Sequence, residues 1–276
     1  MKVALATVAL VAFAACQGPT APQADPRPAG SSAGFFNNGD VRLSYRLDLP
    51  SGDRPAPAVV FGHGSGRATK SACRFLADSF LQRGYATLCF DKRGVGESSG
   101  EYANVGIENS NAVFATLASD LAAAVRFLRT TGSIDGTRIG LAGNSQAGWI
   151  IPIAAAQAQP AFMILLVGPT VSVGEEIFYS QLVEFNSAPL DDAYQQTARY
   201  QGPRGFDPVP TLESLRVPGL WLLGGSDRSI PTPATAGILD RLAQTGRPFT
   251  HVIFEGAGHD LSGAPIWQHI DSWLET

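Results

Sequence analysis

The stretch Arg-Ile-Gly-Leu-Ala-Gly-Asn-Ser-Gln-Ala-Gly-Trp, residues 138–149, decides how the rest of the chain is interpreted. A short apolar run ends at Gly143, Ser145 follows, and Ala147 opens a segment of helical character. A serine at a sharp turn between strand and helix is exposed but strained, and only small residues fit two positions before and after it. Gly143 and Ala147 meet this requirement. The segment predicts a nucleophilic Ser145; the alternative is an ordinary strand-to-helix loop.

Short apolar runs alternate with helical patterns along most of the chain. Runs typical of strands buried on both faces are 58–61, 86–90, 138–142, 162–167, 219–223 and 250–254. Helical patterns cover 71–83, 111–130, 146–157, 235–245 and 265–275. Residues 40–49 alternate apolar and polar side chains, which favours an antiparallel strand with one buried face. This order predicts an α/β fold with a mostly parallel central sheet flanked by helices.

One interval interrupts the alternation between strands and helices. Residues 168–218 contain two helical stretches, 175–186 and 190–201, followed by a segment rich in Pro and Gly. An insertion of this size above the strand ends is typical of elements that shape a substrate site. We therefore expect one domain over 34–276 with a small helical cap inserted at about 170–218.

The N-terminus has the pattern of an export signal. Lys2 precedes an apolar run over 3–15, which is too short to span a membrane and typical of a signal peptide. The end of this run resembles a bacterial lipoprotein box with Cys16 as the lipidated residue, although Phe13 departs from that pattern. Cleavage by an ordinary signal peptidase near Ala15 is the alternative. Residues 16–33 then form a Pro-rich linker, and the protein is expected on the periplasmic side of the envelope, lipid-anchored, or otherwise periplasmic or secreted.

Two cysteines remain if Cys16 carries a lipid. Cys73 opens a helical pattern and Cys89 lies near the end of the following strand. Helix and strand pack together in such units, so a disulfide is geometrically possible in an oxidising compartment. Two buried free thiols are the alternative, and the sequence leaves both open.

Composition restricts the classes of partner. The 276 residues are 45% apolar and 16% charged, with a formal net charge of −4 and no basic run. Nucleic acid is therefore not an expected partner. No Cys/His ligand spacing is present, so neither a metal nor a cofactor is predicted. Membrane contact is expected only through Cys16, and nothing in the sequence specifies an oligomeric state.

A nucleophilic serine needs a histidine base and a carboxylate that orients it. Asp227 follows the apolar run 219–223 in a turn of small residues, and His259 lies in a Gly-rich loop after 250–254. Parallel strands bring their carboxyl ends to one edge of the sheet, so we expect Ser145, Asp227 and His259 to meet there. The other histidines have weaker contexts, since His251 lies in a strand, His269 in the terminal helix and His63 in the Gly-rich loop at 62–66. Among the rival acids, Asp240 lies in a helix, Asp260 adjoins His259, and Glu255 is too close in sequence to orient its ring.

Acyl transfer also needs donors for the developing oxyanion. One is the backbone N–H of Gln146, directly after the serine. The other is expected from Gly-His-Gly-Ser-Gly at 62–66, with the N–H of Ser65 as first choice and that of Gly64 next. Asp91 and Arg93, in the loop after 86–90, are expected to be structural, since the spacing of a phosphate-binding loop is absent.

These motifs together resemble a known superfamily. His-Gly-Ser-Gly, Asp-Lys-Arg-Gly-Val-Gly-Glu-Ser, Gly-Asn-Ser-Gln-Ala-Gly, Gly-Ser-Asp and Gly-His-Asp occur in the order typical of α/β-hydrolases. The chain over about 35–276 is most similar to bacterial esterases and serine aminopeptidase-like hydrolases with a helical cap. The resemblance implies ester hydrolysis through an acyl-enzyme on Ser145. An aminopeptidase or amidase, an acyltransferase, and a binding module of the same fold are the alternatives.

Overall fold

The chain folds around one eight-stranded sheet. The computed structural model describes residues 29–52 and 55–276. The strands are β1 (Gly30–Asn38), β2 (Val41–Leu49), β3 (Ala56–Gly62), β4 (Ala86–Phe90), β5 (Ile134–Asn144), β6 (Met163–Leu166), β7 (Gly219–Gly224) and β8 (Phe249–Phe254). They lie in the order β1-β2-β4-β3-β5-β6-β7-β8. β2 pairs antiparallel with β1 and β4, and the pairs from β4 to β8 are parallel. The predicted α/β fold with a mostly parallel sheet is confirmed.

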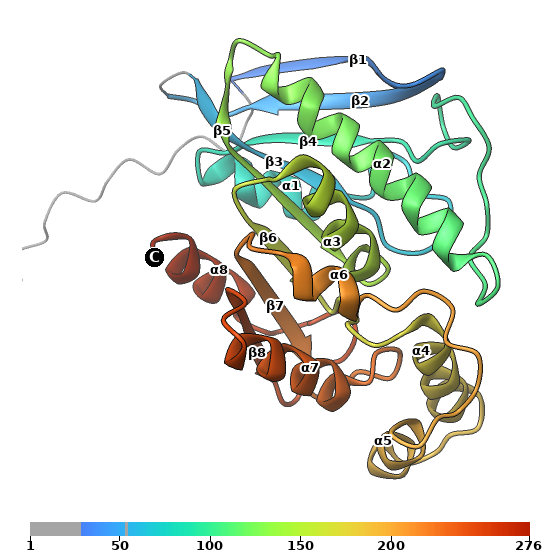
Figure 1. Cartoon of the computed structure of the whole chain (residues 1–276). Helices are drawn as coiled ribbons and strands as arrows, with labels where there is room; N and C mark the ends of the chain where they lie inside the picture. Colours follow the sequence, from blue (N-terminus) through green and yellow to red (C-terminus); the bar gives the residue numbers. More distant parts are fainter. Residues whose placement is uncertain (1–28, 53–54) are drawn as a thin grey trace, which may run out of the picture.

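Helices cover both faces of this sheet. They are α1 (Arg74–Gln82), α2 (Ser110–Arg129), α3 (Ala147–Ala158), α4 (Val173–Ser180), the π-helix η1 (Gln181–Phe185), α5 (Leu190–Thr197), α6 (Val209–Ser214), α7 (Thr232–Gln244) and α8 (Ile266–Leu274). In Figure 1, α2 and α3 cross the near face of the sheet, while α1 lies behind it. Among the described residues only α2 has the length and composition of a membrane span, and it is largely buried as a core helix.

The strands are apolar on both sides because both faces are covered. In β3, Val60 packs into a cluster with α2, α3 and α7, whereas Val59 and Phe61 pack into a second cluster with α1 and α8. In β7, Trp221 belongs to the first of these clusters and Leu222 to the second. Alternate residues of a strand point to opposite faces, so a continuous apolar run fills two cores.

The first strand begins earlier than the boundary expected from the sequence. β1 starts at Gly30, so residues 30–33, assigned above to the linker, belong to the sheet and pair with the end of β2. These residues have no apolar alternation; backbone pairing with β2 makes them a strand. The predicted signal peptide, Cys16 and the linker up to residue 28 lie outside the described residues.

The cap is made by α4, η1 and α5, which Figure 1 shows beyond the ends of the central strands. α4 begins with a capping box, in which the Ser172 hydroxyl and the Glu175 carboxylate bond each other's backbone N–H. Tyr179 and Tyr194 stack inside the cap with ring centroids 5.3 Å apart. α6, which the sequence pattern did not reveal, returns to the body and contacts α3 and α7.

Cys73 and Cys89 form a disulfide, with Cα atoms 6.2 Å apart. The bond joins the residue before α1 to β4. Of the two alternatives that the sequence left open, the structure has the disulfide. It ties the segment after the 62–66 loop to the strand that precedes Asp91.

Candidate active site

Ser145 occupies the turn between β5 and α3. Its φ angle is 53°, in the left-handed region that non-glycine residues rarely adopt. The backbone N–H of Ser145 donates to the carbonyl of Leu166 (2.9 Å), and its own carbonyl accepts from the N–H of Gly148 (2.8 Å). A Cβ added at Gly143 would lie 2.6 Å from the Cβ of Ala147, so the small residues are a steric necessity. The turn thus has the strained geometry that the sequence predicted.

His259 lies between Ser145 and Asp227. Its Nε2 is 3.1 Å from Ser145 Oγ, and its Nδ1 is 2.9 Å from Asp227 Oδ2 and 3.1 Å from Oδ1. The three side chains come from the loops after β5, β7 and β8, which end at the same edge of the parallel sheet. With Nδ1–H donating to the carboxylate, Nε2 is free to accept the serine proton. The structure brings together the three residues that the sequence selected.

Asp227 is held from several directions. Its side chain is fully buried, and Oδ1 also accepts from the backbone N–H groups of Ser229 (2.8 Å) and Ile230 (2.9 Å). The Tyr179 hydroxyl of α4 donates to the Asp227 carbonyl at 2.7 Å. The cap therefore supports the loop that carries the acid.

The electrostatic surroundings favour a protonatable His259. Burial lowers the pKa of this ring, but the hydrogen bond with Asp227 and the charges of Asp227, Glu176 and Glu184 outweigh burial and raise the pKa above its usual value. Glu176, on α4, is itself half-buried, and burial raises the pKa of its carboxyl to about 7 against the opposing effect of His259. A cap carboxyl is thus coupled to the histidine, which no sequence motif indicated.

The backbone N–H groups of Ser65 and Gln146 are the two donors that the sequence predicted for an oxyanion. Within the described chain, neither the Ser65 N–H nor the Gln146 N–H donates to another protein group. Gln146 precedes the first residue of α3, where helix N–H groups lack intrahelical partners. Ser65 is exposed in the loop after β3. Both residues that the sequence selected as donors are therefore free to act.

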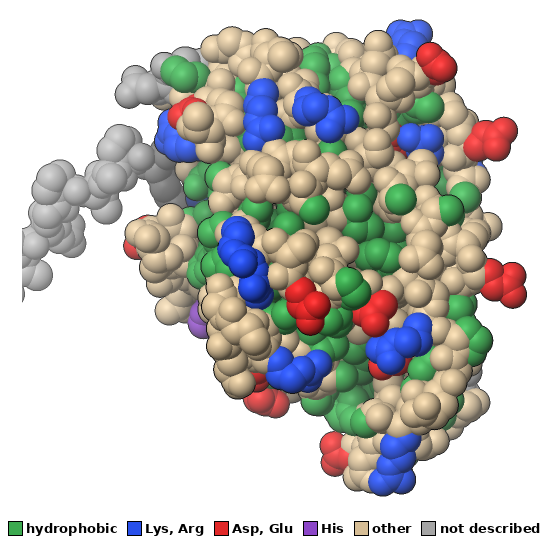
Figure 2. Space-filling model, viewed as in Figure 1, with side chains coloured by type: hydrophobic (Ala, Val, Ile, Leu, Met, Phe, Trp, Pro, Cys, Tyr) green, Lys and Arg blue, Asp and Glu red, His purple; other side chains and the backbone are tan. Residues whose placement is uncertain are grey.

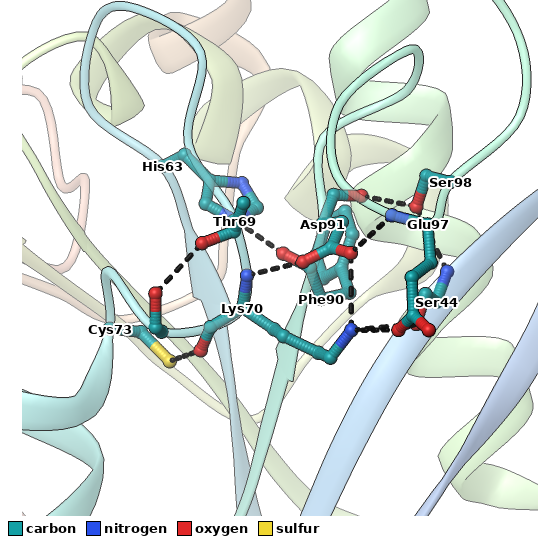
Figure 3. A network of polar contacts seen from close by, with 10 residues as sticks. Ser44, His63, Thr69, Lys70, Cys73, Phe90, Asp91, Glu97 and Ser98 are labelled. Atoms are coloured by element: carbon teal, nitrogen blue, oxygen red, sulfur yellow. Dashed lines mark hydrogen bonds and ion pairs between the residues drawn. The ribbon is translucent and has the colours of Figure 1, made fainter.

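Asp91 and its loop are structural in their contacts, as expected. Figure 3 shows the Asp91 carboxylate between β4 and the Lys70 segment: it accepts from the Lys70 N–H (2.6 Å), from Lys70 Nζ (3.1 Å) and from the Glu97 N–H (2.9 Å). Arg93 instead binds Asp120 of α2 through two hydrogen bonds of 2.7 and 2.6 Å. Asp91 is thus paired with Lys70, and Arg93 with Asp120.

The other histidines have no route to Ser145. His63 is buried and its Nε2 lies 2.6 Å from the Phe90 carbonyl (Figure 3); burial, reinforced by the Lys92 ammonium, lowers its pKa to about 4. His251 faces Asp240 at 3.7 Å, and His269 packs on the ring of Phe254. Their structural roles match the expectation from the sequence.

A cavity of about 240 Å³, lined by apolar side chains together with Asn144 and Asp260, adjoins His259. Phe75 and Leu76 of α1 line it together with Val167 and Leu261. A smaller space of about 40 Å³ shares Leu76 with it and reaches Gly64 in the loop after β3. On the face drawn in Figure 2, Lys and Arg side chains are spread among acidic and apolar ones and form no single basic area.

Known proteins resemble this chain in sequence and fold. An uncharacterised Escherichia coli protein is 32% identical over 119 residues, which are 43% of this chain and 38% of that protein. A putative carboxymethylenebutenolidase of Methylorubrum extorquens is 29% identical over 145 residues, 52% of this chain and 41% of that protein. The chain thus matches about two fifths of the length of these relatives.

The fold also matches solved structures. An esterase of Pyrococcus furiosus superposes with a TM-score of 0.68 at 17% identity, over 89% of this chain and 92% of that one. The model of the prolyl oligopeptidase family matches residues 72–274, which include Ser145, Asp227 and His259. The chain belongs to the prolyl oligopeptidase family and has the α/β-hydrolase fold.

Proposed function

We propose that the protein hydrolyses carboxylic esters of small substrates through an acyl-enzyme on Ser145. The observation that carries the proposal is the hydrogen-bonded series Asp227–His259–Ser145, with Ser145 in a strained turn. Ser145 Oγ attacks the ester carbonyl carbon while its proton passes to His259 Nε2. The Ser65 and Gln146 N–H groups bind the oxyanion, and Asp227 stabilises the imidazolium. His259 then protonates the leaving alcohol, and water hydrolyses the acyl-enzyme by the same steps.

The cavity beside His259 supports a small, uncharged group in the substrate. An apolar cavity of about 150 Å³ is enough to hold benzene. The space of about 240 Å³ lined by Phe75, Leu76 and Leu261 would therefore accept a phenyl ring or a short aliphatic chain. Aryl esters of short acids are suitable first substrates.

The test is Ser145→Ala on p-nitrophenyl acetate and butyrate. We expect kcat/KM to fall by roughly a thousand-fold or more, because the nucleophile is removed. Ser214→Ala, which alters an exposed serine at the end of α6, is the matched control and should retain wild-type turnover. Near-wild-type activity in Ser145→Ala would disprove the assignment.

Peptide or amide hydrolysis is a second candidate, favoured by the match to the prolyl oligopeptidase family. Turnover of aminoacyl anilides and of aryl esters, compared on the same preparation, separates the two. An esterase should cleave the esters and leave the anilides, and product analysis with an added alcohol would reveal acyl transfer.

We further propose export and lipid anchoring at Cys16. The apolar run 3–15 and the small residues 14–15 before Cys16 support this, and the Cys73–Cys89 disulfide agrees with an oxidising compartment. Labelled palmitate should enter the wild-type protein expressed in a bacterium but not Cys16→Ser, while Cys73→Ser should keep the label. Equal labelling of wild type and Cys16→Ser would exclude the anchor.

A further inference from the structure

Lys92 is a buried cation at the base of the candidate site. Its relative exposure is 2%, although it lies in a loop between charged neighbours. Nζ donates to the carbonyl oxygens of Gly64 (2.6 Å) and Gly66 (3.0 Å) and lies 3.2 Å from Gln146 Oε1. An ammonium group has three N–H donors, so these three neutral acceptors satisfy it completely.

The charge of Lys92 has no opposite charge beside it. Among the described residues no carboxylate lies within ion-pair distance of Nζ, and the neighbouring Asp91 is paired with Lys70 instead. Burial lowers the pKa of Lys92 to about 8, so the group is still mainly charged at neutral pH. Keeping an unpaired charge away from water costs stability, and such groups are concentrated at functional sites.

The contact with Gly64 fixes the direction of the Ser65 N–H. The Gly64 carbonyl and the Ser65 N–H belong to one planar peptide group, and in a trans peptide they point in opposite directions. Because the carbonyl points to Lys92 Nζ, the Ser65 N–H points away from it. The third contact holds the side chain of Gln146, whose N–H is the other candidate donor. One ammonium group thus connects the two segments that carry the oxyanion donors.

We propose that Lys92 is a positioning residue for the oxyanion. It fixes the segments of Ser65 and Gln146 relative to each other, and its uncompensated positive charge favours the negative charge that forms on the substrate oxygen. The proposal rests on the proposed serine-hydrolase function. When Ser145 Oγ bonds to the carbonyl carbon, the π electron pair moves to the carbonyl oxygen and the serine proton moves to His259. The oxygen is neutral in the bound substrate and negative only afterwards, so Lys92 acts mainly on the transition state.

The primary test compares Lys92→Met with Lys70→Met. Methionine keeps the length of the side chain but removes the charge and the three donors. We expect kcat for p-nitrophenyl acetate to fall about 10- to 100-fold, with KM within about two-fold of wild type, as for loss of oxyanion stabilisation. Lys70→Met removes the ion pairs to Asp91 and Glu97 and should change kcat by no more than about two-fold.

A trifluoromethyl ketone that forms a tetrahedral adduct with Ser145 provides a second readout. Its inhibition constant should rise in Lys92→Met by about the factor by which kcat falls, whereas the affinity for butyramide, a neutral ground-state ligand, should stay the same. A purely structural role would instead weaken both ligands to the same extent. The unfolding midpoint does not separate the two roles, because Lys92→Met leaves the acceptors at Gly64, Gly66 and Gln146 without their donor in either case.

The outcomes separate this inference from the proposed function. If Lys92→Met matches wild type in kcat while Ser145→Ala is inactive, Lys92 has no such role and the function stands. If Ser145→Ala remains active, the function itself fails. Should Lys92→Met not fold, Lys92→Gln decides: it lacks the charge but keeps an N–H donor, and wild-type kcat in that variant would overturn the proposal.

Discussion

At the scale of single residues, the turn at Ser145 requires that the residues packed around it have small side chains or none. A Cβ at Gly143 would approach the Ala147 Cβ to 2.6 Å and the Gly62 carbonyl oxygen to 2.7 Å. The second of these contacts is with backbone, which cannot rotate away. The strained φ of Ser145 is therefore maintained by close packing of β3, β5 and α3.

Gly143→Ala should therefore destabilise the protein by about 1–3 kcal/mol through overpacking. The displaced turn should also lower kcat on p-nitrophenyl acetate. The measurement is the urea midpoint, with Gly132→Ala as the control, because a Cβ at Gly132 meets nothing within 4 Å. Equal midpoints for the two variants would contradict the steric explanation. A larger residue at Ala147 should act in the same way from the opposite side.

At the scale of elements, the cap acts on the site through α4. Tyr179 bonds the Asp227 carbonyl, and one turn earlier Glu176 contributes to the raised pKa of His259. The cap therefore acts on both the acid and the base of the candidate site. The loop of Asp227 also reaches back to the cap, since the Ser229 hydroxyl donates to Glu184 at 2.7 Å.

Glu176→Gln should shift the acid limb of the pH profile of kcat/KM to lower pH. Neutral His259 is the active form, so activity rises as pH increases through its pKa, which Asp227 and the neighbouring acids raise above its usual value. Removing a nearby negative charge lowers that pKa. Glu175→Gln is the matched control, since Glu175 bonds Ser172 and Arg204 instead. The same shift in both variants would show that the effect is not specific to Glu176.

At the scale of the whole molecule, the sheet is stabilised by two apolar clusters, one on each face. The Cys73–Cys89 disulfide adds a covalent link between α1 and β4, next to the Asp91 network of Figure 3. The Lys92 contacts with Gly64 and Gly66 add a second link, between the loop at 62–66 and the segment after β4.

Loss of the disulfide should lower the free energy of unfolding by about 3 kcal/mol, the value expected for a closed loop of this length. Without the bond, the unfolded chain regains the conformational entropy that closing the loop removed. The two cysteines are separated by 16 positions. Urea unfolding of the Cys73→Ala/Cys89→Ala double variant measures this effect, and the variant should not respond to reductant, whereas the wild type should. If the fully reduced wild type, verified by thiol titration, is as stable as the oxidised form, the prediction is wrong.

The sequence by itself determined the class of fold and the identity of the candidate site. β4 has the predicted bounds, and the order Ser145, Asp227, His259 follows from residues adjacent in the chain to strand ends. Such features are local: an apolar run and a small-residue turn are visible without knowledge of their partners. Parallel strands then bring the three loops together whatever the rest of the chain contains.

Only the tertiary structure decided the features that depend on a distant partner. Residues 30–33 become a strand because β2 lies beside them, and the disulfide forms because α1 packs against β4. Lys92 looks like a surface residue among charged neighbours, yet the loop at 64–66 and Gln146 surround it. Burial and hydrogen-bond partners are set by which segments meet in space, and that information is not contained in any one stretch of sequence.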